Sequence, residues 1–360
     1  MPGTGTSLPQ IDIVIPCYNY GRYLEGAVSS ALNQTGVRTR VLIIDDCSTD
    51  DTQRVGHRLA ANNTHVEYHR HDTNKGHIAT YNEGLLEWAR SEYSVLLSAD
   101  DILAPGALAR ATHLMEHYPD VGMTYGMALV FGDDQPPRIE DQPIATEYRV
   151  IPGSQFLDQC FDLAYCLISA PTVVVRTSVQ QKLGGYCTEL PHSGDAEMWM
   201  RFGFHGSIGI LRSVQAYYRW HGKNMGSRYY QQNIGDHREF WQACRYALDH
   251  WGSQHPQAGY WRDVIGRRLG EHAFWSASRA FDNNKPDECH EWLKFAEEIC
   301  PELRNSSMWR RFWAKRLVGP TAWKLIGSIA NKARGIEASS SASLSKTPFR
   351  FNQEVGWWPG

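Results

Sequence analysis

Short apolar runs alternate with segments of helical periodicity between residues 11 and 120 of the chain. Three runs have the length and the Val, Ile and Leu content of strands, residues 11–17, 41–45 and 93–98, and residues 65–69 could form a short strand between the second and the last of them. Four segments carry helix signals: 21–33, the stretch that begins at Ser48-Thr49-Asp50-Asp51, 77–90, and the stretch after Pro105. Near-continuous apolar strands are typical of parallel sheets covered on both faces. The pattern therefore predicts an α/β fold with a Rossmann-like, mostly parallel sheet and helices on both faces.

The remaining chain is less regular and then becomes helical. Strands are predicted at 172–175, 207–211 and 214–220, and a short helix at 195–204. Between Tyr229 and Cys300 the periodicity is helical throughout. We therefore predict a flexible N-terminus at 1–10, an α/β domain at 11–225, a helical C-terminal region at 226–335 and a tail at 336–360.

Acidic pairs follow two of the predicted strands. Asp45-Asp46 ends the second apolar run, and Asp100-Asp101 follows the run at 93–98. The carboxyl ends of parallel strands share one edge of the sheet, where ligands of open α/β folds bind. The glycine fingerprint G-x-G-x-x-G does not follow the first strand, which argues against a dinucleotide site of the usual kind.

Composition narrows the range of partners. A net charge of −3 gives no general electrostatic support to nucleic-acid binding. The eight cysteines show no Cys-x-x-Cys spacing, so we expect reduced thiols in a reducing compartment. The first ten residues lack the basic and apolar regions of a signal peptide, and no window approaches the ~18 apolar residues of a spanning helix. We expect a cytoplasmic protein.

Six motifs occur in order and carry a family resemblance: Pro16-Cys17-Tyr18-Asn19, Asp45-Asp46-Cys47-Ser48-Thr49-Asp50, Asn74-Lys75-Gly76, Ser98-Ala99-Asp100-Asp101, Gly194-Asp195 before Trp199-Met200-Arg201, and Tyr218-Arg219-Trp220-His221. Together they resemble the inverting glycosyltransferases of family 2, which have the GT-A fold. The resemblance covers residues 11–225. It implies a nucleotide-sugar donor, with UDP expected, a divalent Mn²⁺ or Mg²⁺ ion, and a side-chain base that activates an acceptor hydroxyl.

The resemblance also implies site residues. Asp195 matches the catalytic base. The implied metal residues are Asp100, Asp101 and His221, with Asp100 as the direct ligand. The implied nucleotide-sugar-binding residues are Pro16, Tyr18, Asn19, Asp45, Asp46, Lys75, Gly76, Ser98, Ala99, Glu197 and Arg219. Ser98 stands where many members have Asp, and Gly194 where many have Glu.

Several of these residues also have structural interpretations. Asp46 could cap the next helix, although Asp50 or Ser48 could do so instead. Glu197 is a rival base, which we interpret as a supporting or acceptor contact. Arg201 is expected to pair with an acid inside the domain.

Residues 304–334 contain eight Lys or Arg and no Asp or Glu. Trp309, Phe312, Trp313 and Leu317 share one helical face within this segment. A basic helix with an aromatic stripe is typical of a membrane interface, and packing of the stripe on the protein body is the alternative. The membrane interpretation suits a glycan acceptor linked to a polyprenyl lipid, on the inner face of the cell membrane.

Three functions remain open from the sequence. The first is a metal-dependent, inverting glycosyltransferase acting on a glycan or lipid-linked glycan in bacterial polysaccharide assembly. The second is a lapsed, nucleotide-sugar-binding scaffold at a membrane, for which Ser98 is the supporting feature. The third is a sugar-1-phosphate nucleotidyltransferase, which would require a Gly-rich basic loop after the first strand, where Pro16-Cys17-Tyr18-Asn19-Tyr20 stands.

Overall fold

The computed structural model describes residues 8–133, 146–166, 168–224 and 234–319, together with the short pieces 135, 137–139, 143, 322–323 and 354–355. The chain folds into two compact units. The first comprises residues 1–157, 166–227 and 349–360, and the second comprises residues 158–165 and 228–348. The predicted domain limits remain a proposal, although this division also begins the helical unit close to residue 225.

The first half of unit 1 is a βα repeat. Its elements are β1 (Gln10–Cys17), α1 (Gly21–Leu32), β2 (Arg38–Asp45), α2 (Thr52–Asn62), β3 (Val66–Arg70), α3 (His77–Asn82), the π-helical turn η1 (Glu83–Trp88), β4 (Tyr93–Leu96), β5 (Ile102–Leu103) and α4 (Ala107–His117). Each strand and helix predicted before residue 120 is present within a few residues of its expected place. The helix after Pro105 begins two residues later than the proline, because Gly106 adopts a left-handed conformation before it.

The second half of unit 1 completes the sheet. It contains β6 (Val121–Gly132), β7 (Tyr148–Ile151), the first part of α5 (Gly153–Leu163), the 3₁₀ turn η2 (Ala170–Thr172), β8 (Val174–Arg176), α6 (Thr177–Leu183), α7 (Gly194–His205), β9 (Ser207–Trp220) and β10 (Glu354–Val355). The strands β6 and β7 and the helices α5 and α6 were not predicted from the sequence. The two strands predicted at 207–211 and 214–220 are one strand, β9, whose register against β6 shifts between Leu211 and Val214.

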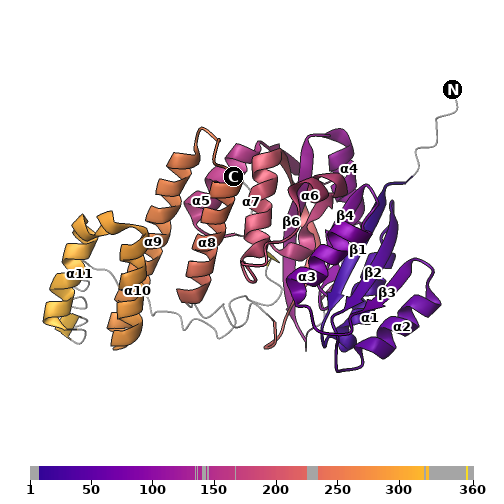
Figure 1. Ribbon diagram of the computed structural model, residues 1–360, viewed down its shortest axis with the longest axis horizontal. Coiled ribbons are helices and arrows are strands. Elements are labelled where there is room, and N and C mark those ends of the chain that lie inside the picture. The colour runs from indigo at the N-terminus through magenta and orange to yellow at the C-terminus, as the bar shows by residue number, and fades with distance from the viewer. Residues whose placement is uncertain are drawn as a thin grey trace. The chain divides into compact units, whose positions relative to one another are not determined.

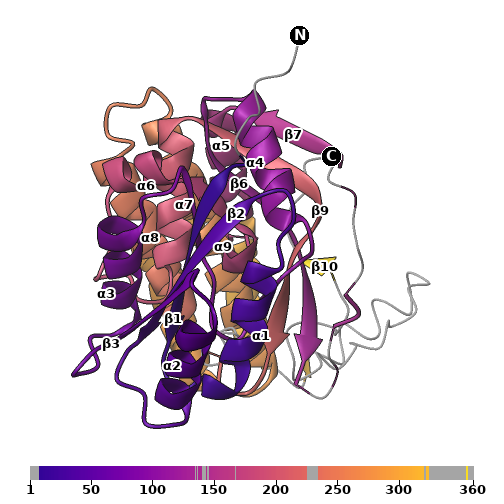
Figure 2. The ribbon, with the colours of Figure 1, turned by 90° about the vertical axis from the view of Figure 1, so that its right-hand side faces the viewer.

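The sheet has the order β3-β2-β1-β4-β8-β6-β9-β5, with β7 paired to β9 and β10 to β6. The pairs β3–β2, β2–β1, β1–β4 and β6–β9 are parallel, and the pairs that involve β8, β5, β7 and β10 are antiparallel. Helices α1, α2 and α4 share one apolar core with the strands, and α3, α6 and α7 lie on the other face (Figures 1 and 2). The predicted fold class, a mostly parallel sheet with helices on both faces and a helical C-terminal region, is confirmed.

The secondary-structure elements that the structure describes in unit 2 are all helices. Its helices are α8 (Ile234–His250), α9 (Ala258–Asp282), α10 (Pro286–Ile299) and α11 (Ser307–Val318), with the 3₁₀ turn η4 (Pro301–Asn305) before α11. A core of Ala, Phe and Trp side chains from α9, α10 and α11 holds it together. Among the described residues, no helix combines the length and the apolar character that a membrane crossing requires.

Candidate active site

The acidic segment after β4 meets the end of β9 and the residues that follow it. Asp100 and Asp101 are both almost fully buried. The Asp100 Oδ2 atom lies 3.1 Å from His221 Nε2 and 3.4 Å from Asn224 Nδ2. The Asp101 Oδ1 atom accepts a hydrogen bond of 2.9 Å from the Arg219 amide, and Arg219 Nε donates to the Asp100 carbonyl at 2.8 Å. The structure therefore brings together two predicted motifs that lie about 120 residues apart in sequence.

These two adjacent carboxyls fit a divalent cation. Burial raises the pKa of Asp101 well above its usual range, and the nearby charge of Asp100 raises it further. A bound dication would offset both effects, and carboxylate oxygen with imidazole nitrogen suits Mn²⁺. Asp101 faces the Arg219 amide, so Asp100 and His221 are the side chains placed to hold such an ion. A ligand diphosphate and water would complete the coordination, as the retained waters of Mg²⁺ sites do.

Two tyrosines that the motifs did not single out support His221. The Tyr23 ring is stacked on the imidazole with 5.4 Å between ring centroids, and the Tyr20 ring meets it edge-on at 5.5 Å. The Tyr23 hydroxyl donates to Asp133 at 2.7 Å, and the Arg219 guanidinium lies 4.5 Å from the Tyr23 ring centroid. Both tyrosines follow β1 at the start of α1 and could have been suspected from that place in the sequence. Their pairing with a residue 200 positions later could not.

Asp195 stands at the first turn of α7, as predicted. Burial raises the pKa of its carboxyl to about 6, although the charge of His192 opposes this shift. A carboxylate with a pKa in this range can take a proton and release it near neutral pH. Its structural environment is therefore compatible with a general base.

Asp195 and the Asp100–Asp101 pair raise the pKa of the same tyrosine hydroxyls. Burial raises the pKa of Tyr81, and the negative charges of Asp195 and then Asp100 raise it further. Burial also raises the pKa of Tyr218, with contributions from Asp101, Asp100 and Asp195. The two parts of the predicted site thus lie within electrostatic reach of shared side chains.

Asp45 and Asp46 are held by protein donors. The fully buried Asp45 accepts from the Ser48 amide at 2.8 Å, the Tyr68 hydroxyl at 2.6 Å and Arg70 Nη1 at 2.5 Å. Burial alone would raise the pKa of Asp45, but these donors hold it below its usual value. Its oxygens are paired inside the protein, and its assignment to the nucleotide remains a prediction.

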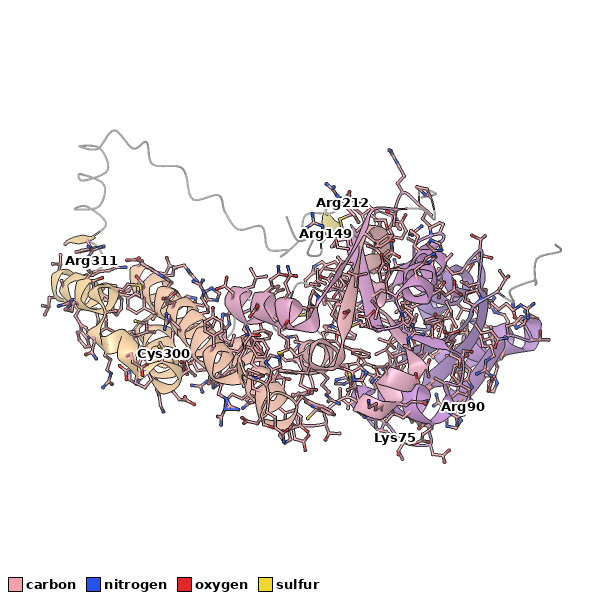
Figure 3. All side chains as sticks on the ribbon, turned by 90° about the horizontal axis from the view of Figure 1, so that it is seen from above. Lys75, Arg90, Arg149, Arg212, Cys300 and Arg311 are labelled. Atoms are coloured by element: carbon pink, nitrogen blue, oxygen red, sulfur yellow. The ribbon has the colours of Figure 1, made fainter. Side chains whose placement is uncertain are left out.

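Asp46 fixes the predicted Lys75-Gly76 segment. Its Oδ1 atom accepts from the Lys75 amide at 2.7 Å, and its Oδ2 atom accepts from the Gly76 amide at 2.9 Å. Gly76 has a φ of 85°, which favours glycine, and α3 begins directly after it. The Lys75 ammonium is half-exposed at the surface of the unit and pairs with Glu83 at 2.9 Å (Figure 3).

Hydrogen bonds join the loop after β1 to the loop after β2. Asn19 adopts a φ of 58°, its amide donates to Ser48 Oγ at 2.9 Å, and its Oδ1 atom accepts from the Thr49 amide at 2.8 Å. Asp50, not Asp46, bonds the start of α2, through the Thr52 amide at 2.9 Å, and it also accepts from the Gly21 amide at 3.0 Å. The helix-cap alternative for Asp46 is therefore wrong.

Four further predicted residues lie along these loops and differ in exposure. Tyr18 is 49% exposed and free to contact a ligand surface, whereas Ala99 is buried. Pro16 pairs with Ile44 in the β1–β2 register, and Ser98 is partly buried. Their assignment to the nucleotide remains a prediction.

Glu197 has a structural partner. Arg201 Nε donates to both Glu197 oxygens, at 2.6 and 2.8 Å, and the Glu197 side chain is fully buried. Arg201 also donates to the carbonyls of Leu183 and Gly185. The expected pairing of Arg201 with an internal acid is confirmed. The Glu197 carboxylate faces Arg201, and its assignment as a rival base or a nucleotide-sugar contact remains a prediction.

The fold defines the class of protein. The chain is similar to the solved structure of Staphylococcus aureus TarS 1–349, with a TM-score of 0.57 and 16% identity over 81% of each chain. It is also similar to the mannosyltransferase PcManGT from Pyrobaculum calidifontis, solved with GDP-Man and Mn²⁺, with a TM-score of 0.56 and 16% identity over 91% of this chain and 81% of that one. These are GT-A glycosyltransferases, and this chain shares their fold.

The sequence matches a known family over part of its length. Residues 12–171 match the family model described as Glycosyl transferase family 2. An uncharacterized glycosyltransferase of Nostoc sp. is 26% identical over 228 residues, which are 60% of this chain and 66% of that protein. Chondroitin synthase of Pasteurella multocida is 38% identical over 101 residues, 28% of this chain and only 10% of that protein. The chain thus spans less than two thirds of these relatives' length, and the match to family 2 glycosyltransferases, over residues 12–171, agrees with the resemblance that its motifs carry.

Proposed function

We propose that this protein is a metal-dependent, inverting glycosyltransferase that transfers one sugar from a nucleotide diphosphate sugar to a hydroxyl of a glycan or lipid-linked glycan. One observation carries the proposal. The buried Asp100 lies 3.1 Å from His221 Nε2, and the two residues come from motifs 121 positions apart. They would form a cation site, and Asp195, at the first turn of α7, would supply the base that this reaction also needs.

Each of the site residues has its own role in the proposed sugar transfer. Asp100 and His221 would hold the cation, which when bound neutralises the charge that develops on the diphosphate leaving group. Asp101, turned to the Arg219 amide, keeps the segment in place. Asp195 would accept the proton of the acceptor hydroxyl as that oxygen attacks the anomeric carbon from the face opposite the diphosphate. A single displacement of this kind inverts the anomeric centre.

A nucleotide sugar is the proposed donor, and UDP is the proposed nucleotide. Two structural neighbours support a donor of this class, since TarS 1–349 was solved with UDP-GlcNAc and PcManGT with GDP-Man. The anchored loops that carry Asn19, Asp46 and Lys75 would hold the nucleotide part.

The proposed acceptor is a glycan at the inner face of a bacterial membrane, reached by peripheral association. The partial match to a chondroitin synthase supports a polysaccharide acceptor. The structure corrects part of the aromatic stripe, because Trp309 and Phe312 are buried in the core of unit 2. Trp313 and Leu317 are exposed and remain available for a membrane surface. The second half of segment 304–334 lies mostly outside the described residues.

Donor binding and turnover should be tested separately. Thermal melting of the protein with UDP-GlcNAc, UDP-glucose and GDP-mannose, each with and without Mn²⁺, would identify the donor, because a ligand of the native state raises the melting temperature. We expect Asp100→Ala to lose the Mn²⁺-dependent part of the stabilisation. We expect Asp195→Asn to keep donor binding and to lower turnover by about 10²- to 10⁴-fold.

The control is Asp51→Asn, which changes an exposed carboxylate with one surface partner, Arg54. It should keep both binding and turnover. Wild-type turnover by Asp195→Asn would show that the base is misassigned. Donor binding without turnover in the wild-type protein, across the acceptors tried, would favour the lapsed scaffold. Release of pyrophosphate from a nucleoside triphosphate would favour the nucleotidyltransferase.

A further inference from the structure

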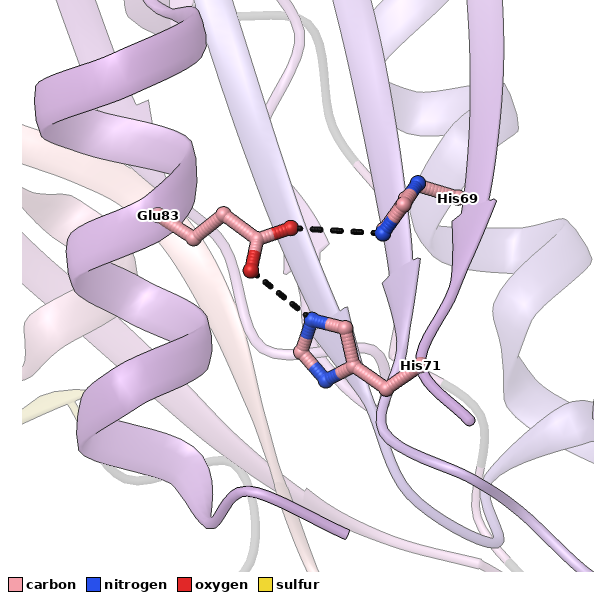
Figure 4. Close-up of side chains that lie close together, drawn as sticks. All are labelled: His69, His71 and Glu83. Carbon is pink, nitrogen blue, oxygen red and sulfur yellow. Dashed lines mark hydrogen bonds and ion pairs between the residues drawn. The ribbon is translucent and has the colours of Figure 1, made fainter. Parts of the chain in front are cut away.

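A second cluster of metal-ligand side chains lies away from the Asp100 site. Within the part of the chain that the structure describes, one group of at least three His, Cys, Asp or Glu side chains has all its ligand atoms within 4.8 Å of one another: His69, His71 and Glu83. Figure 4 shows both imidazoles turned toward the carboxylate of Glu83. None of these residues belongs to the motifs from which the function is proposed.

The backbone sets this arrangement. His69 lies in β3 and His71 directly follows it, so the two side chains, two residues apart, leave the strand on the same face. Glu83 comes from the neighbouring helix, at the point where α3 changes into the π-helical turn η1. Such turns are rare, and they occur often at functional sites.

The distances suit a tetrahedral ion. His71 Nε2 lies 3.0 Å from Glu83 Oε2, and His69 Nε2 lies 3.5 Å from Glu83 Oε1. Ligand atoms bound to Zn²⁺ at about 2.0–2.1 Å in a tetrahedron are about 3.3 Å apart. The two contacts go to different oxygens of Glu83, so the three ligand atoms, which lie within 4.8 Å of one another, would draw closer around the ion.

The imidazole of His71 lies between two carboxylates, which calls for a cation. Its side chain is fully buried, and Nδ1 lies 2.8 Å from Asp46 Oδ1. A metal ion held by Nε2 and Glu83 would leave Nδ1 directed at Asp46, so each carboxylate would keep a positively polarised partner. A carboxylate that orients a metal-binding histidine through its other nitrogen is a recurrent feature of protein metal sites.

We infer that His69, His71 and Glu83 form a site for a borderline divalent transition metal, with Zn²⁺ as the fitting ion. Two imidazoles and one carboxylate match the ligand preferences of Zn²⁺, and they leave a fourth position for water. Without Zn²⁺, the half-exposed Lys75 ammonium, 2.9 Å from Glu83, supplies the positive charge beside this carboxylate. Metal binding would displace this half-exposed lysine.

The site is joined to the proposed nucleotide loop through one side chain. Asp46 contacts His71 and also accepts from the amides of Lys75 and Gly76. Zinc held by His71 would therefore fix Asp46 and the loop that starts α3. The metal site itself rests on its own geometry and stands whether or not the chain is a glycosyltransferase.

The test is a titration of tag-free protein with Co²⁺, followed by competition with Zn²⁺, in excess Mg²⁺. Mg²⁺ prefers oxygen ligands and would occupy the Asp100 site, leaving the histidine site for the transition metal. We expect one equivalent of Co²⁺ to produce the visible absorption of a tetrahedral complex and Zn²⁺ to abolish it. Zn²⁺ should also raise the melting temperature.

Variants separate a metal site from a simple ion-pair network. His69 is exposed, so His69→Ala should fold normally, lose the Co²⁺ spectrum and lose the Zn²⁺ effect on melting. His65→Ala removes another exposed histidine four residues earlier and should behave like the wild type. Asp46→Asn should weaken Zn²⁺ binding about 10- to 100-fold. A wild-type protein without the spectrum, or a His69→Ala variant that keeps it, would overturn the inference.

Discussion

The Asp195 carboxyl is the residue whose chemistry depends most on its surroundings. Burial raises its pKa to about 6, with His192 acting in the opposite direction. The sequence could predict an acid at the start of this helix, because Gly194-Asp195 precedes a helical pattern. It could not predict the pKa, which is raised by the burial of the carboxyl in the folded unit.

The pH profile should report this pKa. A base must be unprotonated to accept a proton, so transfer by the wild-type protein should fall as the pH drops through about 6. The measurement is kcat/KM against pH with a saturating metal concentration. A rate that stayed flat down to about pH 4.5 would contradict a base with the raised pKa.

The ionised Asp195 carboxyl should lower the stability of the folded protein at neutral pH. Its pKa is raised from 3.8 to about 6 in the folded protein, so the folded state binds its proton more tightly than the unfolded state does. The stability that this provides is complete below about pH 4 and is lost as the pH rises through about 6. Asp195→Asn should therefore be more stable than the wild type at pH 7, by about 1 to 3 kcal/mol.

Urea unfolding at neutral and acidic pH would measure this difference. The gap between the variant and the wild type should close toward about pH 4. A variant that was less stable than the wild type at pH 7 would show that the carboxylate is favourably paired instead. The functional residue would then contribute to folding as well as to catalysis.

At the scale of elements, periodicity predicted the parallel half of the sheet and failed where strands carry mixed sequence. The strand β6 contains Gly122, Thr124 and Gly126 in its first half, so its continuous apolar run is limited to residues 127–131, and the strand was not predicted. The strand β9 contains the exposed Arg212, which interrupts its pattern, although the chain continues through the shift in register. Tertiary pairing with β6 determines both strands, and this information is not local.

The helix α7 depends on one buried ion pair. Arg201 holds Glu197 and the carbonyls of Leu183, at the end of α6, and Gly185, just after it, and almost nothing of the Arg201 or Glu197 side chain reaches solvent. Arg201→Met would leave Glu197 as an uncompensated buried charge. We expect a loss of about 3 to 5 kcal/mol in the free energy of unfolding, measured by urea titration.

The control for this prediction is Arg212→Met. Arg212 lies on β9 next to β7, where it pairs with Glu147 at the surface (Figure 3). A surface pair of this kind contributes about 0 to 1 kcal/mol. If both variants lost the same stability, the buried pair would have no special role in α7.

At the scale of the whole molecule, the sequence placed the change to helical structure near residue 225 but missed a contribution from an earlier segment. Residues 158–165, the second part of α5, belong to unit 2. Within that unit, Asp158 accepts from the indole nitrogen of Trp261 at 2.7 Å. A helix that passes from one unit into the other has no signature in its own periodicity, so it could not have been predicted.

Membrane association is a property of the whole molecule, and α11 allows it to be tested. Trp313 and Leu317 are 48% and 88% exposed, whereas Trp309 is buried. Replacing both exposed residues with Ser should weaken sedimentation with anionic phosphatidylglycerol vesicles and leave the melting temperature unchanged. Trp309→Ala should instead lower the free energy of unfolding by about 3 to 5 kcal/mol.

Neutral phosphatidylcholine vesicles are the control for this prediction. Binding to anionic vesicles alone would point to the cations of this segment, and equal binding to both would point to its aromatic residues. A wild-type protein that remained in the supernatant with both lipids would contradict peripheral association.

The bonds that join Asp100 and Asp101 to Arg219 and His221 also constrain the order of events during folding. They connect positions 118 to 121 residues apart, so a growing chain that has completed β1 to β4 still lacks half of the cation site. Contacts of such long sequence separation form slowly. The ability to recognise a donor should therefore arise late in refolding, after the strands have acquired their secondary structure.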